Sequence, residues 1–117
     1  MNCGVFCVQR YLQLTGKEDD GIIDELNARV TDRGLSLLDM KEVLERHGFA
    51  VGCYHDRKPQ YCFPLIMLDN KRGHYYLVYG RQGNEILMSE VTLGDFRIHI
   101  FFFKTLWSYY YLTVRQV

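Results

Sequence analysis

The spacing of apolar residues changes once along this chain, at Gly48, and that change constrains the fold more than any other feature. Before Gly48 the apolar residues recur at helical spacing, which is typical of helices that bury one face. After Gly48 they form short runs rich in Val, Ile, Leu and Tyr, separated by polar and glycine-bearing turns, which is typical of strands. Helices followed by strands predict an α+β domain.

Three helices are expected in the first half. The first has its apolar face over Val5–Leu12 and ends at Gly16 as the C-terminal cap. The second has its apolar face over Ile22–Val30 and begins after a cap at Asp19 or Asp20. The third has its apolar face over Leu37–His47 and begins with a capping box of Ser36 and Asp39. These three helices should pack on the sheet that the second half forms.

Six strands are expected in the second half, namely Ala50–Tyr54, Pro64–Leu68, His74–Tyr79, Glu85–Glu90, Arg97–Ile100 and Tyr109–Thr113. Asn70–Gly73 and Gly80–Asn84 are short turns, so the strands they join should be antiparallel neighbours in a mostly antiparallel sheet. Phe101–Trp107 is expected to be a short helix or a bend whose aromatic side chains dock on the core.

Length and composition favour one domain over residues 1–117, since 117 residues of 48% hydrophobic content suit a single core. Fourteen basic and fourteen acidic residues cancel, and no basic stripe with aromatics is present, so nucleic acid is not an expected partner. We find no apolar run long enough to span a membrane and no signal peptide. We therefore expect a cytoplasmic domain with four reduced cysteines.

Cys3 stands at the start of the first helix, where free backbone amides and the positive end of the helix dipole stabilise a thiolate. The position favours a nucleophile, and the amide of Cys3 itself suits an oxyanion donor. Gly4 is expected to leave the backbone open to a carbonyl substrate. The alternative is that Cys3 is only a small packing residue, the commoner use of a lone cysteine.

His74 opens a strand directly after a turn, a position that suits a general base, although histidines at strand ends are more often structural. Glu90 ends the next strand. If the hairpin between them is centred near Gln82 and has no bulge, Glu90 lies opposite His74 on the same face. The carboxylate would then orient the imidazole, as the third group of a triad does.

A metal site is a further alternative, because Cys3 and Cys7 are one helical turn apart and Cys53, Cys62 and four histidines are available. The spacing argues against it. Structural zinc sites usually use two closely spaced pairs, and Cys53 and Cys62 form no such pair. We therefore expect no metal and no cofactor.

Several motifs resemble those of the double-glycine leader peptidase domain of bacteriocin-exporting ABC transporters, a papain-like cysteine peptidase. The family's Asp-Cys-Gly motif corresponds to Asn2-Cys3-Gly4, with a second cysteine at Cys7. The other matching segments, in chain order, are Gly34–Met40, Pro64–Ile66, Gly73–Tyr76 and Phe103–Trp107. The match runs over nearly the whole chain.

This resemblance implies a papain-like fold and cleavage of a leader peptide after a double-glycine-type site by Cys3, His74 and Glu90. It also implies, as partners, a peptide with small residues at the cleavage site and the membrane and nucleotide-binding regions of an ABC transporter. The expected location is then the cytoplasmic face of the membrane.

Two departures from the family pattern lead to an alternative function. The family has a glutamine six residues before the nucleophile that helps to form the oxyanion hole, whereas only Met1 and Asn2 precede Cys3 here, so we expect the N-terminal strand with this glutamine to be missing. The family's Asp-Pro after the histidine is here Glu90-Val91. Since losing one oxyanion donor costs about a hundred- to a thousandfold in rate, the alternative is a catalytically impaired domain that binds peptide or cargo for a transporter.

Overall fold

The protein is described over residues 1–117 by a computed structural model with four helices and one six-stranded sheet. The helices are α1 (Cys3–Thr15), α2 (Asp20–Arg29), α3 (Leu37–Arg46) and α4 (Ile100–Leu106). The strands are β1 (Phe49–His55), β2 (Leu65–Asp69), β3 (His74–Gln82), β4 (Glu85–Glu90), β5 (Gly94–His99) and β6 (Tyr110–Gln116). The expected α+β class is confirmed.

Each of the first three helices begins at a side chain that caps its N-terminus. Asn2 caps α1, Asp19 caps α2, and Ser36 caps α3 by accepting a hydrogen bond from the amide of Asp39. Gly16 ends α1 in the left-handed conformation that glycine adopts at low cost. The caps at Asp19, Ser36 and Gly16 were expected from the sequence, whereas the cap at Asn2 was not.

The sheet is antiparallel throughout, with the strand order β1-β6-β2-β3-β4-β5. β2 to β5 form a meander, and the two hairpins expected around Asn70–Gly73 and Gly80–Asn84 are confirmed. The last strand, β6, lies between β1 and β2 and pairs with both. The end of the chain therefore connects β1, which follows the three N-terminal helices, to the meander. β3 consequently lies inside the sheet, paired on both sides.

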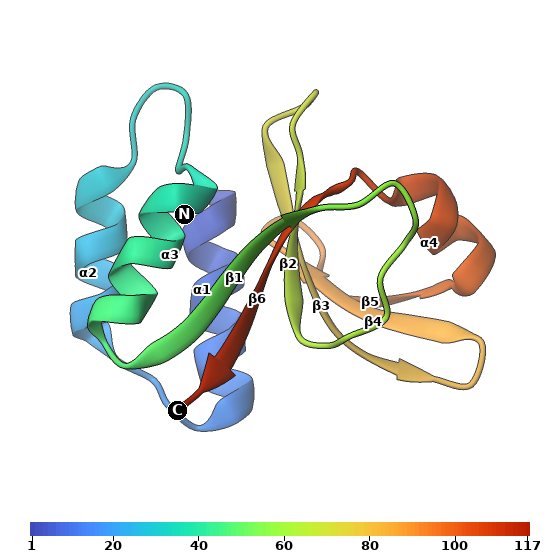
Figure 1. The fold of residues 1–117 in the computed structure, drawn as a ribbon, viewed down its shortest axis with the longest axis horizontal. Helices are drawn as coiled ribbons and strands as arrows, with labels where there is room; N and C mark the ends of the chain where they lie inside the picture. Colours follow the sequence, from blue (N-terminus) through green and yellow to red (C-terminus); the bar gives the residue numbers. More distant parts are fainter.

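The two faces of the sheet are covered differently. Figure 1 shows α1, α2 and α3 gathered on one side of the curled sheet and α4 at the opposite end of the molecule. Alternate side chains of β3 point to opposite faces of the sheet. Leu77 belongs to the larger apolar cluster, with α1, α2 and α3, and Val78 belongs to the smaller cluster, with α4. His74 and Tyr76 share the parity of Val78, so their side chains lie on the α4 side.

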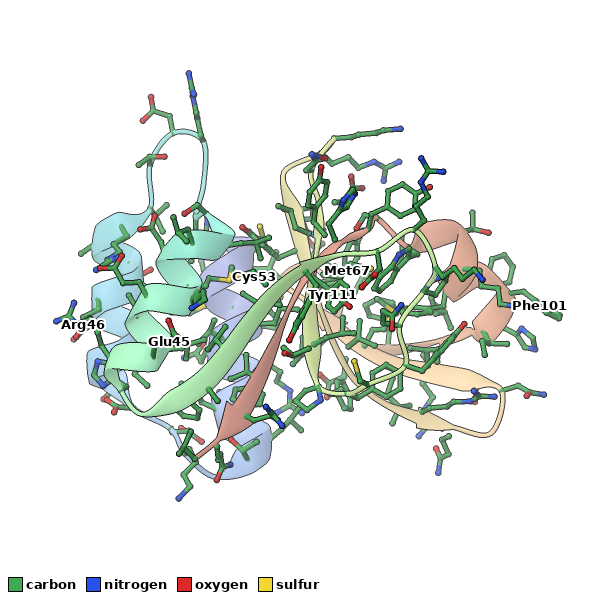
Figure 2. All side chains as sticks on the ribbon, viewed as in Figure 1. Glu45, Arg46, Cys53, Met67, Phe101 and Tyr111 are labelled. Carbon is green, nitrogen blue, oxygen red and sulfur yellow. The ribbon has the colours of Figure 1, made fainter.

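The segment expected to be a short helix or bend is the helix α4, and it docks only in part. Phe103 and Trp107 are buried in the smaller cluster, with the Trp107 indole donating to the carbonyl of Asp56 at 2.9 Å. Phe101 and Phe102 are 67% and 70% exposed, contrary to expectation. Figure 2 shows Phe101 pointing away from the body of the protein. Phe101 and Phe102 cannot both share the buried face of Phe103, because adjacent residues of a helix point in different directions.

None of the helices is long and apolar enough to cross a membrane.

Candidate active site

Cys3 is the first residue of α1, and it is a partly exposed free cysteine. The Asn2 side-chain oxygen accepts hydrogen bonds from the amides of Gly4 at 2.8 Å and Val5 at 3.2 Å. The Cys3 amide has no acceptor within the helix, since it belongs to the first turn. The thiol donates weakly to the carbonyl of Gly73, 3.7 Å away, which places the sulfur beside the residue that precedes His74.

Gly4 has a different role from the one expected. A Cβ at this position would lie 2.5 Å from Cε of Met40 and 3.1 Å from Cδ2 of Tyr75. Gly4 is buried and faces the core, so its missing side chain lets α1 approach α3 and β3. The glycine thus positions Cys3 against the strand of His74, and it is not an opening for substrate.

The other three cysteines lie in places that do not suit a nucleophile beside His74. Cys7 is fully buried on α1, and burial, followed by the nearby Cys3 and Glu90, raises the pKa of its thiol well above the ordinary value. Cys53 lies on β1, which β6 and β2 separate from β3, and Cys62 lies between β1 and β2. All four thiols are free.

His74 and Glu90 are in direct contact across the hairpin. Nε2 of His74 lies 2.9 Å from Oε2 of Glu90, and the two side chains are 25% and 6% exposed. Because Nε2 is engaged by the carboxylate, Nδ1 is the ring nitrogen left for another partner. The ring of Tyr76 packs edge-on against the imidazole, with centroids 4.8 Å apart.

Glu90 stays ionised because its hydrogen bonds outweigh its burial. Burial by itself acts to raise the pKa of this carboxyl group, but the amides of Thr92 and Leu93 donate to its oxygens at 3.1 Å and 2.6 Å. With the contact to His74, these bonds hold the pKa below its ordinary value of 4.5. A buried, ionised carboxylate therefore faces the imidazole.

The register of this hairpin differs from the expected one. The strands run on to Gln82 and Glu85, so the turn is Gly83–Asn84 and not a longer loop centred near Gln82. A bulge between Val78 and Gly80 then shifts the pairing, and Leu77 lies opposite Ser89. Glu90 is therefore level with Tyr76, and the expected pairing of Glu90 with His74, which assumed a hairpin without a bulge, was wrong. The carboxylate reaches the imidazole diagonally on the same face.

A cleft of about 490 Å³ opens next to the thiol. We call it the Cys3 cleft; its lining includes Cys3, Gly34 and Leu35 on one side and Asn70 and Gly73 on the other. Figure 1 shows the two segments that border it, the loop between α2 and α3 and the β2–β3 hairpin, rising on the same side of the molecule. Cys3 is part of the lining of the cleft, whereas His74 is not.

Tyr75 fixes one wall of the Cys3 cleft. Its buried hydroxyl donates to the carbonyl of Leu35 at 2.5 Å, tying β3 to the loop between α2 and α3. Burial raises the pKa of the Tyr75 phenol, so the group remains a donor over the ordinary pH range. Two hydrogen bonds between Thr31 and Gly34, of 3.0 Å and 2.9 Å, close the tip of the same loop.

No three side chains of His, Cys, Asp or Glu come together in a way that would hold a metal ion.

The sequence profile of the peptidase C39 family matches the chain over residues 1–117. The chain belongs to the peptidase C39 family. The resemblance drawn from the motifs around Cys3, Gly34 and His74 is thereby confirmed at the level of the family. No match was found among curated proteins.

Solved structures show the same C39 peptidase fold. A double-glycine motif protease from an AMS/PCAT transporter, crystallised with the leader peptide, superposes with a TM-score of 0.83 at 17% identity, over 99% of this chain and 85% of that one. The peptidase domain of Streptococcus ComA, a bifunctional ABC transporter, gives 0.78 at 19% identity, over 99% and 92%. The N-terminal peptidase C39-like domain of a Vibrio parahaemolyticus toxin secretion ATP-binding protein gives 0.72 at 16%, over 97% and 93%.

The sequence suggested Cys3, His74 and Glu90 as candidate site residues, but two further residues beside them were not predicted from it. Asn2 was read only as part of a motif, although an asparagine directly before a helical pattern is a cap signal. Tyr75 was read only as a strand residue. Its bond to Leu35, forty positions away, has no local signal in the sequence.

Proposed function

We propose that this C39 family member is a cysteine peptidase that cleaves a leader peptide after a double-glycine-type site, with Cys3 as nucleophile, His74 as general base and Glu90 as the group that orients His74. The observation that carries the proposal is the contact between Nε2 of His74 and the buried carboxylate of Glu90. It leaves Nδ1 of a fixed imidazole to exchange a proton with the thiol at the start of α1.

The reaction follows from these roles. Nδ1 of His74 takes the thiol proton, and Sγ of Cys3 attacks the carbonyl carbon of the scissile bond. The oxyanion that forms is met by the Cys3 amide, which has no acceptor in α1. The imidazolium then gives its proton to the leaving amine, and water, deprotonated by His74, hydrolyses the thioester. Glu90 stabilises the imidazolium while it exists.

The direction of the peptide follows from the same geometry. His74 must lie beside the leaving amine, and it does not line the Cys3 cleft. We therefore place the segment before the scissile bond in the cleft, between Leu35 and Gly73, and the segment after the bond on the His74 side. Small residues at the cleavage site suit a cleft whose inner wall is made by Leu35 and Tyr75.

The solved relatives support a leader peptide as the substrate class, since one of them was crystallised with a leader peptide and two belong to ABC transporters or secretion ATP-binding proteins. We extend this to the present chain as part of the proposal. It would act at the cytoplasmic face of the membrane, together with the membrane and nucleotide-binding regions of an ABC transporter.

The test is cleavage of a double-glycine leader peptide, followed by mass spectrometry. The wild type should cut after the second small residue, and Cys3→Ala should leave no measurable cleavage while melting at the same temperature. Cys53→Ser is the matched control, because that thiol is also solvent-accessible but lies on β1, and it should retain full activity.

A catalytically impaired, peptide-binding domain is the competing function. It predicts that the wild type binds the leader peptide as tightly as Cys3→Ala does and leaves the peptide intact at any enzyme concentration. That result would overturn the peptidase proposal.

A further inference from the structure

Arg10 ties the helix that begins at Cys3 to the edge of the sheet. Its guanidinium donates two parallel hydrogen bonds to Asp95 of β5, from Nε to Oδ1 at 3.0 Å and from Nη2 to Oδ2 at 2.7 Å. Because both groups are planar, this two-pronged contact fixes direction as well as distance. About two helical turns after Cys3, α1 is thereby joined to a residue 85 positions further along the chain.

Asp95 stands at the end of the turn that holds the carboxylate of Glu90. It directly follows Gly94, which pairs with Glu90 where β4 and β5 meet. Between these two lie Thr92 and Leu93, whose backbone amides donate to the Glu90 oxygens at 3.1 Å and 2.6 Å. A contact that fixes Asp95 therefore also fixes one end of the turn on which the position of Glu90 depends.

On the side of the N-terminal helices, β5 has little else to hold it. It is an edge strand of the sheet, and none of its residues is fully buried. Phe96 and Ile98 pack against the smaller apolar cluster, on the α4 side, and the other ion pair of β5 stays within the sheet. No other side-chain hydrogen bond or ion pair joins β5 to α1, α2 or α3. The contact between Arg10 and Asp95 is thus the polar tie between this strand and the helical half.

We infer that Arg10 is a positioning residue, which holds Asp95 against α1 and so keeps the turn of Glu90 in place beside the nucleophile helix. The inference rests on the proposed function for the role of Glu90. Arg10 makes no hydrogen bond to His74 or Glu90, so it acts only through the turn. Small displacements of a catalytic group cost large factors in rate. The two side chains are 27% and 42% exposed, so the pair should add little to global stability.

Steady-state cleavage of the leader peptide tests this role. Arg10→Gln and Asp95→Ala should each lower kcat by about 10-fold, with KM and the melting temperature little changed. Gln13→Ala is the matched control, because Gln13 is the other partner of Arg10, at 3.4 Å and within α1, and it should behave as the wild type. In a Glu90→Gln background, Arg10→Gln should lower kcat no further, because the orienting carboxylate is already absent. A wild-type kcat in Arg10→Gln, or an equal loss in both backgrounds, would overturn the inference.

The pKa of the Glu90 carboxyl group, followed by carbon-13 NMR, is a readout that does not need cleavage. Two backbone amides and the contact to His74 lower this pKa, and Arg10 is not among the groups that shift it. If the turn loosens, these contacts weaken, so the pKa should rise in both Arg10→Gln and Asp95→Ala. A direct effect of charge would have opposite signs in the two variants, since one loses a cation and the other an anion. Opposite shifts would therefore contradict the positioning role.

The two readouts keep this inference distinguishable from the proposed function. If the wild type cleaves nothing but the pKa of Glu90 rises in both variants, the peptidase proposal fails and the role of Arg10 in placing Glu90 stands. If the wild type cleaves, and both kcat and the pKa are unchanged in the two variants, only the role of Arg10 fails.

Discussion

Glu90 meets His74 diagonally, from a position level with Tyr76, and a β-bulge is what makes the meeting possible. From the turn at Gly83–Asn84, a regular hairpin would pair Glu90 with Leu77, whose side chain faces the helices. The bulge before Gly80 moves the pairing by one residue, which returns Glu90 to the face of His74. The proposed triad thus depends on one extra residue in β3.

Replacing Glu90 by Gln should lower activity more than stability. The Thr92 and Leu93 amides donate to different oxygens of Glu90, so the single oxygen of the glutamine keeps only one of these two bonds. The amide also cannot stabilise an imidazolium, so kcat for leader-peptide cleavage should fall by about 10²- to 10⁴-fold with KM little changed. Steady-state kinetics measure this. Glu85→Gln, an exposed change on the same strand, is the control and should behave as the wild type. Equal kcat values in the two variants would rule out Glu90 as the orienting group.

The ionised state of Glu90 should also make the fold sensitive to acid. Its pKa in the folded state is below the ordinary value of 4.5, so its contribution to the free energy of unfolding is present above that value and is lost as the pH falls through the folded-state pKa. Urea unfolding should therefore show a stability difference between wild type and Glu90→Gln near neutral pH. The difference should shrink below about pH 4. A difference that is constant with pH would contradict this assignment.

A methyl group at Gly4 should cost stability, although alanine is the better helix former. Its Cβ would lie 2.5 Å from Cε of Met40, a distance that real side chains do not show, and a tight 3.1 Å from Cδ2 of Tyr75, so α1 or the Met40 side chain must shift. We expect Gly4→Ala to lower the free energy of unfolding by about 1–3 kcal/mol and to slow cleavage by displacing Cys3. Chemical denaturation measures the first effect. Gly80→Ala is the control, since its Cβ would meet Leu87 only at an ordinary 3.4 Å.

Removing the hydroxyl of Tyr75 should loosen the wall of the Cys3 cleft. Tyr75→Phe leaves the carbonyl of Leu35 without its donor, which should cost about 1–3 kcal/mol and raise KM, because the loop between α2 and α3 loses its tie to β3. Tyr76→Phe, a change to the neighbouring half-buried ring, is the comparison. A Tyr75→Phe enzyme with wild-type KM would show that the bond does not shape the substrate site.

Much of this protein follows from the sequence because the signals are local. Only neighbouring residues determine the helical spacing, the caps at Asp19 and Ser36, and the turns after Asp69 and Gln82. Each helix or strand expected from these signals is present. The family motifs around Cys3 and His74 are also short contiguous segments. The sequence therefore determined the fold class and the family, and it supplied the three side chains that we propose as a triad.

Only the tertiary structure decided how segments far apart in the chain meet, including the contact between His74 and Glu90. Three features join residues that are far apart in the chain, where local spacing carries no information. They are the placement of β6 between β1 and β2, the packing of Met40 and Tyr75 against Gly4, and the hydrogen bond from Tyr75 to Leu35. The bulge in β3 is of the same kind, because a shift of one residue reverses the face of every side chain beyond it.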